Sequence, residues 1–289
     1  MAHTASQRQK VTSFFSIRNK MITSFAVFAV SILTIVYIAA IYFASVSLLN
    51  NTEYFLKELV KSSSKVLDER SQALFGKLEA FSNLPLIQDD TVSYQEKIEL
   101  FKNEIQMQKQ RGWMSFGISG LDGILYRTDN TVEKVTGEEW FQSARKGKYV
   151  ITEPALSSVE RKYLFIVAIP VRDLQGKIVG VINATILGDA LSNLISDIIV
   201  GETGTAYLVS SSGIVLGNRR PEILYKSIYN EIIGSDTSAF AQFLKQSLAS
   251  HKSSVNVSEI KGIKYISAVA SMRYADWTLL LTAPVSEFM

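Results

Sequence analysis

The stretch KYLFIVAIPVRDLQGKIVGVINATI, residues 162–186, decides the fold of this 289-residue chain. Two runs rich in β-branched and aromatic residues, 162–171 and 178–186, lie on either side of the turn sequence DLQG at 173–176. Two such runs joined by a short glycine-containing turn predict a β-hairpin. We therefore expect a fold with an antiparallel sheet built around this hairpin.

Further strand-like and helical segments lie on both sides of the hairpin. Before it, the runs 116–119 and 124–128 flank a turn at 121–123 that contains glycine. Residues 138–145 predict a short helix, because acidic side chains at its start suit the helix dipole. A further helix is expected at 189–199, directly after the hairpin.

The same order of elements then repeats in the last third of the chain. Residues 206–210 and 214–217 flank a turn at 211–213, as the two strands do around the earlier glycine turn. The runs that follow predict a closing three-stranded meander, at 254–260, 264–272 and 277–283. Two successive units with one strand order predict tandem copies of a small α/β module.

Residues 51–83 predict a long helix, because apolar residues recur there at spacings of three, four and seven. These residues are Leu56, Leu59, Val66, Leu67, Leu74, Leu78 and Phe81. Pro85 ends the pattern, and a second helix is expected at 93–110. The apolar stripe could seal one flank of a domain, or pair with the same helix of a second subunit through Leu59, Val66, Leu74 and Leu78.

An apolar stretch precedes this helix, since residues 21–49 contain no charged side chain. It is longer than the roughly 20 residues that span a bilayer. Its N-terminal flank is basic, with Arg8, Lys10, Arg18 and Lys20. Basic flanks stay in the cytoplasm, so we predict an uncleaved transmembrane helix and an exported domain. A cleaved signal peptide is the alternative, because 43–47 resembles a weak cleavage site, but signal cores have only about 7–15 apolar residues.

Composition argues against several classes of function. The chain has 30 basic and 27 acidic residues, and four of the basic residues lie in the N-terminal tail. The remaining 26 basic residues are balanced by the 27 acidic ones, so no basic surface for nucleic acid is expected. The absence of cysteine excludes a disulfide framework, a thiol nucleophile and a zinc-thiolate site. The only histidines are His3 and His251, and the phosphate-binding pattern GxxxxGK(S/T) does not occur. We expect no enzymatic activity, no cofactor and no metal.

Several motifs in the last third resemble one known family. The sequence GETGTAYLV at 201–209, followed by Ser212 and Gly213, is similar to the opening of the membrane-proximal half of a double-Cache sensor domain. The sequence DWTLL at 276–280 resembles the closing strand of that half.

The first module carries matching motifs in the order and spacing of the same family. They are Trp140 with Phe141, then ITEP at 151–154, then VGV at 179–181. The resemblance covers roughly residues 50 to 289. It implies two tandem PAS-like (Cache) modules, each with an antiparallel sheet.

The resemblance places the ligand in the membrane-distal module, on a concave sheet face lined by aromatic and polar side chains. The candidate ligand-binding residues are Trp113, Tyr126, Arg127, Asp129, Glu138, Trp140, Phe141, Tyr163 and Thr185. Each has a structural alternative, since aromatic rings in a sheet more often pack than bind. Arg127 at a strand edge would be solvated, and Glu138 would favour the start of a helix.

Two of the charged anchors of an amino-acid pocket are replaced in this chain. Family members that bind α-amino acids have an Arg two residues before the Trp, where this chain has Glu138. They also have an Asp on the last strand of the distal module, where this chain has Thr185. The implied ligand is therefore a small organic molecule other than a standard α-amino acid, either an anion bound by Arg127 or a cation bound by Glu138 and Asp129.

The expected organisation is an α+β chain with an N-terminal transmembrane helix, a long stalk helix and the two modules. Its parts are a cytoplasmic tail at 1–20, the transmembrane helix at 21–47, the long helix and second helix at 48–110, the distal module at 111–200 and the proximal module at 201–289. The family forms the periplasmic or extracellular sensing part of bacterial methyl-accepting chemotaxis receptors in the inner membrane. The alternatives are the sensor of a membrane diguanylate cyclase or histidine kinase, and a non-signalling anchored binding protein. We expect the sequence to be a fragment, because a second membrane helix would come next.

Overall fold

The computed structural model describes residues 17–230, 234 and 238–288. The chain divides into two compact units, Met1–Asn50 and Asn51–Met289, and each is described by itself. Helix α1 (Ile17–Ser82) begins in the first unit and ends in the second. Every strand of the described residues lies in the second unit.

The described part of the first unit, residues 17–50, is helical throughout. Most of its large apolar side chains, such as those of Phe25, Tyr37 and Phe43, are more than half exposed. Among the described residues, α1 is the one helix that is long and apolar enough to cross a membrane. The hydrocarbon core of a bilayer covers apolar surface of this kind.

The first module contains a seven-stranded sheet in the order β3-β2-β1-β7-β6-β4, with β5 paired to β6. Its strands are β1 (Trp113–Gly120), β2 (Ile124–Arg127), β3 (Val132–Lys134), β4 (Val150–Ile151), β5 (Ala155–Leu156), β6 (Tyr163–Arg172) and β7 (Ile178–Leu187). The predicted hairpin is confirmed, because β6 and β7 pair in antiparallel fashion. Gly176 in its turn has a φ of 82°, a left-handed conformation that glycine adopts without steric cost.

The second module contains a five-stranded sheet in the order β10-β11-β12-β8-β9. Its strands are β8 (Thr205–Ser210), β9 (Val215–Gly217), β10 (Ser254–Ile260), β11 (Ile263–Ser271) and β12 (Trp277–Pro284). In both modules the first strand lies between the second strand and the last strand. This shared strand order confirms the predicted α+β fold with two modules and two antiparallel sheets.

Short helices connect and cover the sheets. They are α2 (Pro85–Gln88), α3 (Tyr94–Gln108), α4 (Glu139–Ala144), α5 (Ala190–Leu194) and α6 (Ala239–Ser250), with the 3₁₀ helices η1 (Lys109–Arg111), η2 (Pro221–Ile223) and η4 (Val285–Phe288). The sequence did not predict α6. Helix α3 begins where expected, because Ser93 and Glu96 form a capping box.

The helix predicted at 189–199 is wrong in length, since α5 ends at Leu194. The carbonyl groups of Leu194 and Ser196 bond to arginine side chains instead of continuing a helical ladder. Arg70 donates to the carbonyl of Leu194, and Arg219 Nη2 donates to the carbonyl of Ser196 over 2.8 Å. Arginine side chains from elsewhere in the fold therefore pair with carbonyl groups at the end of this helix and just after it.

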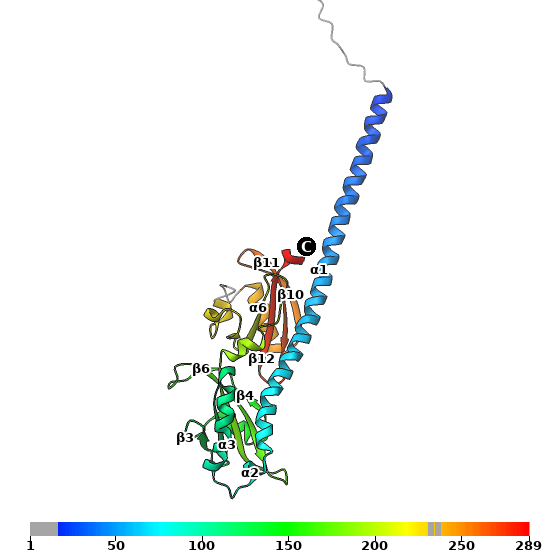
Figure 1. Cartoon of the computed structure of the whole chain (residues 1–289). Coiled ribbons are helices and arrows are strands. Elements are labelled where there is room, and N and C mark those ends of the chain that lie inside the picture. The colour runs from blue at the N-terminus through cyan, green and yellow to red at the C-terminus, as the bar shows by residue number, and fades with distance from the viewer. Residues whose placement is uncertain (1–16, 231–233, 235–237, 289) are drawn as a thin grey trace, which may run out of the picture. The chain divides into compact units, whose positions relative to one another are not determined.

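Within the second unit, α1 packs against both modules. Its buried side chains are Leu56, Val60, Leu67, Phe75 and Leu78. Asp68 Oδ1 accepts a hydrogen bond from the backbone N–H of Arg273 over 2.7 Å, and Glu79 Oε1 accepts one from the Tyr149 hydroxyl over 2.6 Å. Figure 1 shows this cyan part of α1 beside strands of both sheets.

This packing corrects one element of the predicted dimer contact. Leu78 is fully buried within its own chain, so it is not free to contact a second subunit. Leu59 and Leu74 are half-buried, whereas 42% of Val66 is exposed. The stripe on α1 therefore seals the flank of its own domain along most of its length.

An ion pair also joins α1 to the segment between the modules. Arg70 Nη1 donates to Asp197 Oδ1 over 2.8 Å, and Arg70 Nη2 donates to Asp197 Oδ2 over 2.5 Å. The hydrogen bond from Arg70 lowers the pKa of Asp197 to about 2. Because Asp197 is largely exposed, the pair positions this segment more than it stabilises the fold.

The two faces of the first sheet have different neighbours. On one face, Phe116 packs against Phe81 of α1 and Phe101 of α3, with ring centroids 5.6 and 5.5 Å apart. On the other face, Leu125, Ala168 and Val181 pack against Trp140 and Phe141 of α4. We call this second face the α4 face.

Candidate functional site

The α4 face carries a group of polar side chains in the middle of the sheet. Cα partners in an antiparallel pair point to the same face. Asn183 pairs with Ala168 on β6 and Gly117 on β1, and Gly117 pairs with Arg127 on β2. Thr185 pairs with Ser115, and Ser119 pairs with Val181, which belongs to the α4 cluster. We call Ser115, Ser119, Arg127, Asn183 and Thr185 the polar strip.

Asn183 is the least satisfied polar side chain of this strip. It is fully buried, and in the described chain neither its Oδ1 nor its Nδ2 has a hydrogen-bond partner. Its neighbours across the sheet are small, since a Cβ atom on Gly117 would overlap Asn183 Oδ1. A buried polar group without a hydrogen-bond partner lowers the free energy of unfolding by about 1–3 kcal/mol. An amide with two such atoms therefore needs an explanation.

Ser119 adds a second unsatisfied group two residues from Gly117. Its side chain is fully buried, and its Oγ has no hydrogen-bond partner among the described residues. Asn183 and Ser119 together place one unpartnered amide and one unpartnered hydroxyl on the α4 face. Hydrogen bonds from a polar ligand or an ordered water would satisfy them.

Arg127 forms the other end of the strip and is paired. Its Nη1 donates to Thr185 Oγ1 over 2.8 Å and to Ser115 Oγ over 3.4 Å. Its Nε donates to Glu133 Oε1 over 3.0 Å, and its Nη2 also contacts that oxygen. Only 14% of the Arg127 side chain is exposed, so the expectation of a solvated arginine is wrong. Glu133 compensates its charge, and the strip is close to neutral.

Trp140 and Phe141 cover this face from α4. Both are buried, and both belong to the cluster that contains Ala168 and Val181, the residues that flank Asn183. Helix α4 places them one after the other, with ring centroids 6.0 Å apart and nearly perpendicular planes. The structure therefore brings together four of the sequence-predicted site residues on one face: Arg127, Trp140, Phe141 and Thr185.

Trp113 and Tyr126 do not join this group, because they lie on the opposite face of the sheet. Tyr126 stacks on Tyr94 of α3 with ring centroids 5.2 Å apart. Trp113 packs against Phe116, and Lys77 Nζ lies 5.4 Å from the centroid of its ring. These two aromatic residues cannot line one pocket together with Trp140.

The three remaining candidates also lie away from this group. They are Tyr163, Asp129 and Glu138. Tyr163 lies at the start of β6 and stacks on Tyr225 of the second module. Asp129 Oδ1 accepts from the backbone N–H and the hydroxyl of Thr131, over 2.9 and 2.6 Å, and so closes a turn. Glu138 is exposed and precedes the first residue of α4.

The sequence reasoning missed Ser115, Ser119 and Asn183. One signal was present, because Asn183 is a polar residue inside an otherwise apolar run of the hairpin. A strand period of two places it on the same face as Thr185, which was a candidate. Nothing in the sequence showed that its amide would lack a partner.

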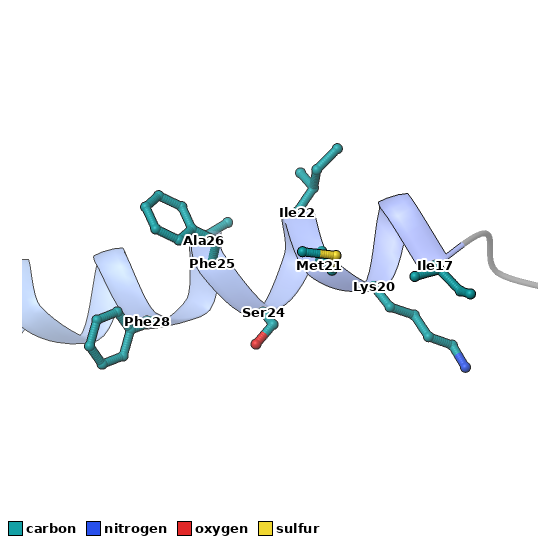
Figure 2. A pocket seen from close by; sticks show the side chains of 8 residues that line it. All are labelled: Ile17, Lys20, Met21, Ile22, Ser24, Phe25, Ala26 and Phe28. Carbon is teal, nitrogen blue, oxygen red and sulfur yellow. The ribbon is translucent and has the colours of Figure 1, made fainter.

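A hollow at the start of α1 is not a comparable site. Figure 2 shows its lining, which comes from a single helix and includes Ile22 and Phe25 on one side and Lys20 and Phe28 on the other. No second described element walls it. It is open apolar surface of the kind that lipid covers.

No group of three or more His, Asp and Glu side chains that could hold a metal occurs among the described residues. The polar strip offers hydrogen bonds and a compensated guanidinium, and Trp140 and Phe141 offer aromatic surface beside it. Groups of these kinds occur in sites that bind small molecules.

The profile of the Cache domain family matches residues 36–289, nearly nine-tenths of the chain. The chain belongs to the Cache domain family. The family's domains are non-catalytic sensors that bind ligands, and the predicted resemblance is confirmed. No curated protein matches this Cache domain by sequence.

Solved structures of sensory domains share the fold of this Cache domain. The sensory domain of the Campylobacter jejuni chemoreceptor Tlp3 with isoleucine bound has a TM-score of 0.64 and 14% identity, and covers 85% of this chain and 98% of that chain. The same receptor domain in complex with L-valine has a TM-score of 0.62, 14% identity and the same coverage. The extracellular domain of the histidine kinase mmHK1S-Z3 has a TM-score of 0.60 and 13% identity, and covers 80% of this chain and 95% of that chain. Such low identity shows the fold alone.

Proposed function

We propose that this chain is the extracytoplasmic small-molecule sensor of a bacterial transmembrane chemoreceptor, with its ligand on the polar strip of the first module. The supporting observation is the buried, unpartnered amide of Asn183 beneath Trp140 and Phe141 in a Cache domain. The sensor of a histidine kinase is the second candidate, because extracellular domains of such kinases share the fold.

The proposed setting is the inner membrane, with residues 21–47 as the anchor and the second unit outside the cytoplasm. The uncharged helix and the basic flank support this orientation. The domain boundaries at 20, 47, 110 and 200 stay predictions. Homodimerisation through α1 also stays a prediction, with Leu59, Val66 and Leu74 as the predicted contact residues that are not fully buried. Disulfide cross-linking of single cysteines placed at these positions tests whether two copies of α1 are in contact.

The proposed ligand is a neutral or weakly charged small molecule other than a standard α-amino acid. Arg127 is already paired with Glu133, so it offers no uncompensated charge to a ligand carboxylate. The strip also contains no carboxylate for a ligand ammonium group. The Tlp3 domain binds isoleucine and L-valine, and this proposal sets the present chain apart from it.

The test is a binding screen of the full chain in lipid nanodiscs, followed by isothermal titration of each hit. We expect L-isoleucine and L-valine not to bind, and a polar uncharged compound to bind with saturation. Asn183→Ala should weaken that binding by about tenfold or more, as expected for the loss of a buried hydrogen bond. Tight binding of a standard L-amino acid would contradict the proposed ligand class, and a ligand that is indifferent to Asn183→Ala would contradict the site.

A contact between the modules links the polar strip to the second sheet. The rings of Tyr163 and Tyr225 stack with centroids 3.7 Å apart and planes 11° apart. The Tyr225 hydroxyl donates to Asp189 Oδ1 over 3.1 Å, and Gly188 has no room for a side chain because Tyr225 occupies that space. Gly188 follows Thr185 by three residues, at the end of β7. We call Tyr163, Gly188, Asp189 and Tyr225 the junction.

The backbone at Tyr225 has an unusual conformation that supports this proposal. Tyr225 has a φ of 62°, a left-handed conformation that costs energy for a residue with a side chain. Its N–H donates to the carbonyl of Val215 in β9 over 2.7 Å. Burial, together with Asp189, raises the pKa of Tyr225 well above its usual value, so the phenol stays protonated and can donate. We propose that ligand-induced movement of β7 reaches the second module through the junction.

We expect Tyr225→Phe to lower the free energy of unfolding by about 1 kcal/mol, because it removes one hydrogen bond and keeps the stacked ring. The double variant Tyr225→Phe with Asp189→Ala should cost little more than Asp189→Ala alone. Urea unfolding of the full chain measures this cycle. Additive losses would show that the two side chains are not coupled.

A further inference from the structure

Lys97 is a buried amine that belongs to no site described above. It lies near the start of α3, and only 4% of the residue is exposed. Its Nζ lies 5.2 Å from the centroid of the Tyr94 ring, and it has neither a hydrogen bond nor a salt bridge to any residue that the structure describes. Lysine is almost never this buried without a charged partner, so its position needs an explanation.

Lys97 lines a small hollow between α3 and the first sheet. Tyr94 and Ile118 also line it, and Ile118 pairs with Tyr126, on which Tyr94 stacks. The hollow therefore lies mainly on the side of the sheet opposite the α4 face, and of the polar strip Ser119 alone borders it. Its volume of about 20 Å³ is enough for one water molecule or for a group of that size. We call it the narrow hollow.

A larger hollow adjoins the narrow one, since Gln88, Asp90 and Val179 line both. It lies between the segment after α2 and the turn of the β6–β7 hairpin, which contributes Asp173 and Gln175. We call it the wide hollow, and its volume of about 390 Å³ is enough for a small organic molecule. Because the two hollows share a wall, a molecule in the wide hollow can extend one small group toward the amine.

The surroundings of Lys97 favour a reactive amine and disfavour an anionic ligand. Burial lowers the pKa of Lys97, although the nearby carboxylates of Asp89 and Asp90 oppose this effect. More of this amine is therefore neutral than at an exposed lysine, and the neutral amine is the nucleophile. The same two carboxylates attract a product that keeps a positive charge, and together with Asp173 they repel an anion in the wide hollow.

We propose that Lys97 forms a reversible imine with a small, uncharged hydroxyaldehyde whose formyl group enters the narrow hollow. The nitrogen Nζ attacks the carbonyl carbon, and the carbonyl oxygen leaves as water with two protons of the amine. A C=N bond replaces the C=O bond, and the protonated imine has the same charge as the lysine ammonium. The amides of Gln88 and Gln175 line the wide hollow and are partners for the hydroxyl group of the aldehyde.

The first test is reductive trapping of the native full chain in nanodiscs. Glycolaldehyde is added with sodium cyanoborohydride, which converts each imine into a stable amine, and peptide mass spectrometry measures the labelling of each lysine. Lys102 is the matched control, because it lies on the same helix, is 37% exposed and pairs with Glu99. We expect Lys97 to be labelled about tenfold faster than Lys102 or more. Equal or slower labelling of Lys97 overturns the proposal.

The second test asks whether the hollows select the class of aldehyde. Glyoxylate replaces glycolaldehyde, because it is an aldehyde of similar size that carries a carboxylate. The ratio of labelling at Lys97 to labelling at Lys102 should fall by about tenfold, since the carboxylates that line the wide hollow repel glyoxylate. An equal ratio for the two aldehydes would show that the hollows do not select the ligand, and would overturn the proposed class.

The third test blocks the route to the amine without changing Lys97. Gln88→Phe places a ring where the two hollows meet, and it should lower the labelling of Lys97 by glycolaldehyde about tenfold while Lys102 stays unchanged. Gln106→Phe is the matched control, because Gln106 is exposed on α3 and lines neither hollow. Unchanged labelling of Lys97 in folded Gln88→Phe, or an equal loss in Gln106→Phe, overturns the site.

Discussion

Asn183→Leu should make the unliganded chain more stable by about 1–3 kcal/mol and should abolish binding at the polar strip. Leu has the branched shape of Asn, but it buries no polar atom. The amide of Asn183 is fully buried and, among the described residues, has no partner at either Oδ1 or Nδ2. Removing an unsatisfied buried group recovers the free energy that its dehydration costs. For a domain of this size, the gain raises Tm by roughly 5 °C.

Thermal unfolding of the full chain in nanodiscs measures this change, and titration with the ligand found in the screen measures the loss of binding. Asn193→Leu is the matched control, because Asn193 is exposed in α5 and should show little change in Tm. A decrease in Tm for Asn183→Leu would show that the amide is satisfied, by ordered water or otherwise, and serves the fold instead of a ligand. The test is strong because the same variant should increase the stability of the chain and abolish ligand binding.

Gly204→Ala should destabilise the second module by about 3 kcal/mol, through steric overlap with the backbone. A Cβ atom at this position would overlap the carbonyl oxygen of Val200 and would lie 2.8 Å from that of Thr282. Both neighbours are main-chain atoms, and Thr282 is in β12, which pairs with β8 directly after Gly204. Relief of the overlap with Thr282 requires a shift in the pairing of β8 with β12, and relief of the overlap with Val200 requires a shift of the segment before β8.

The control for this variant is Gly137→Ala. No atom lies within 4 Å of a Cβ added at Gly137, and its φ is not in the left-handed region. The control should therefore unfold at the same urea concentration as the native chain, whereas Gly204→Ala should unfold at a clearly lower one. Equal midpoints for the two variants would mean that the loop before β8 adjusts without cost.

Most strands of both modules could be predicted from the sequence because each of them has a distinct local signal, whereas the short strands β3, β4 and β5 were not predicted. The hairpin of β6 and β7 consists of two largely apolar runs around a glycine turn, and its observed limits differ by at most one residue from the predicted ones. The repeated strand order could also be predicted, because the strands and glycine turns of both modules have local signals in the sequence. The family resemblance added the arrangement of the two modules, which no local pattern contains.

The candidate site could be predicted only in part, because it depends on which face each residue shares. The sequence selected Arg127, Trp140, Phe141 and Thr185, and these do lie on one face. It could not show that Trp113 and Tyr126 face the opposite way. Helix α6 also escaped prediction, although Ser238 caps it and its apolar side face is clear in the structure.

The pairing of Arg127 with Glu133 has a consequence for the habitat of a cell that carries this protein. Dissolved ions weaken attraction between opposite charges at protein surfaces, but they have little influence on hydrogen bonds made by buried neutral groups such as the Asn183 amide and the Thr185 hydroxyl. Recognition through the amide of Asn183 and the hydroxyl of Thr185 should therefore work equally well in fresh water and in brine.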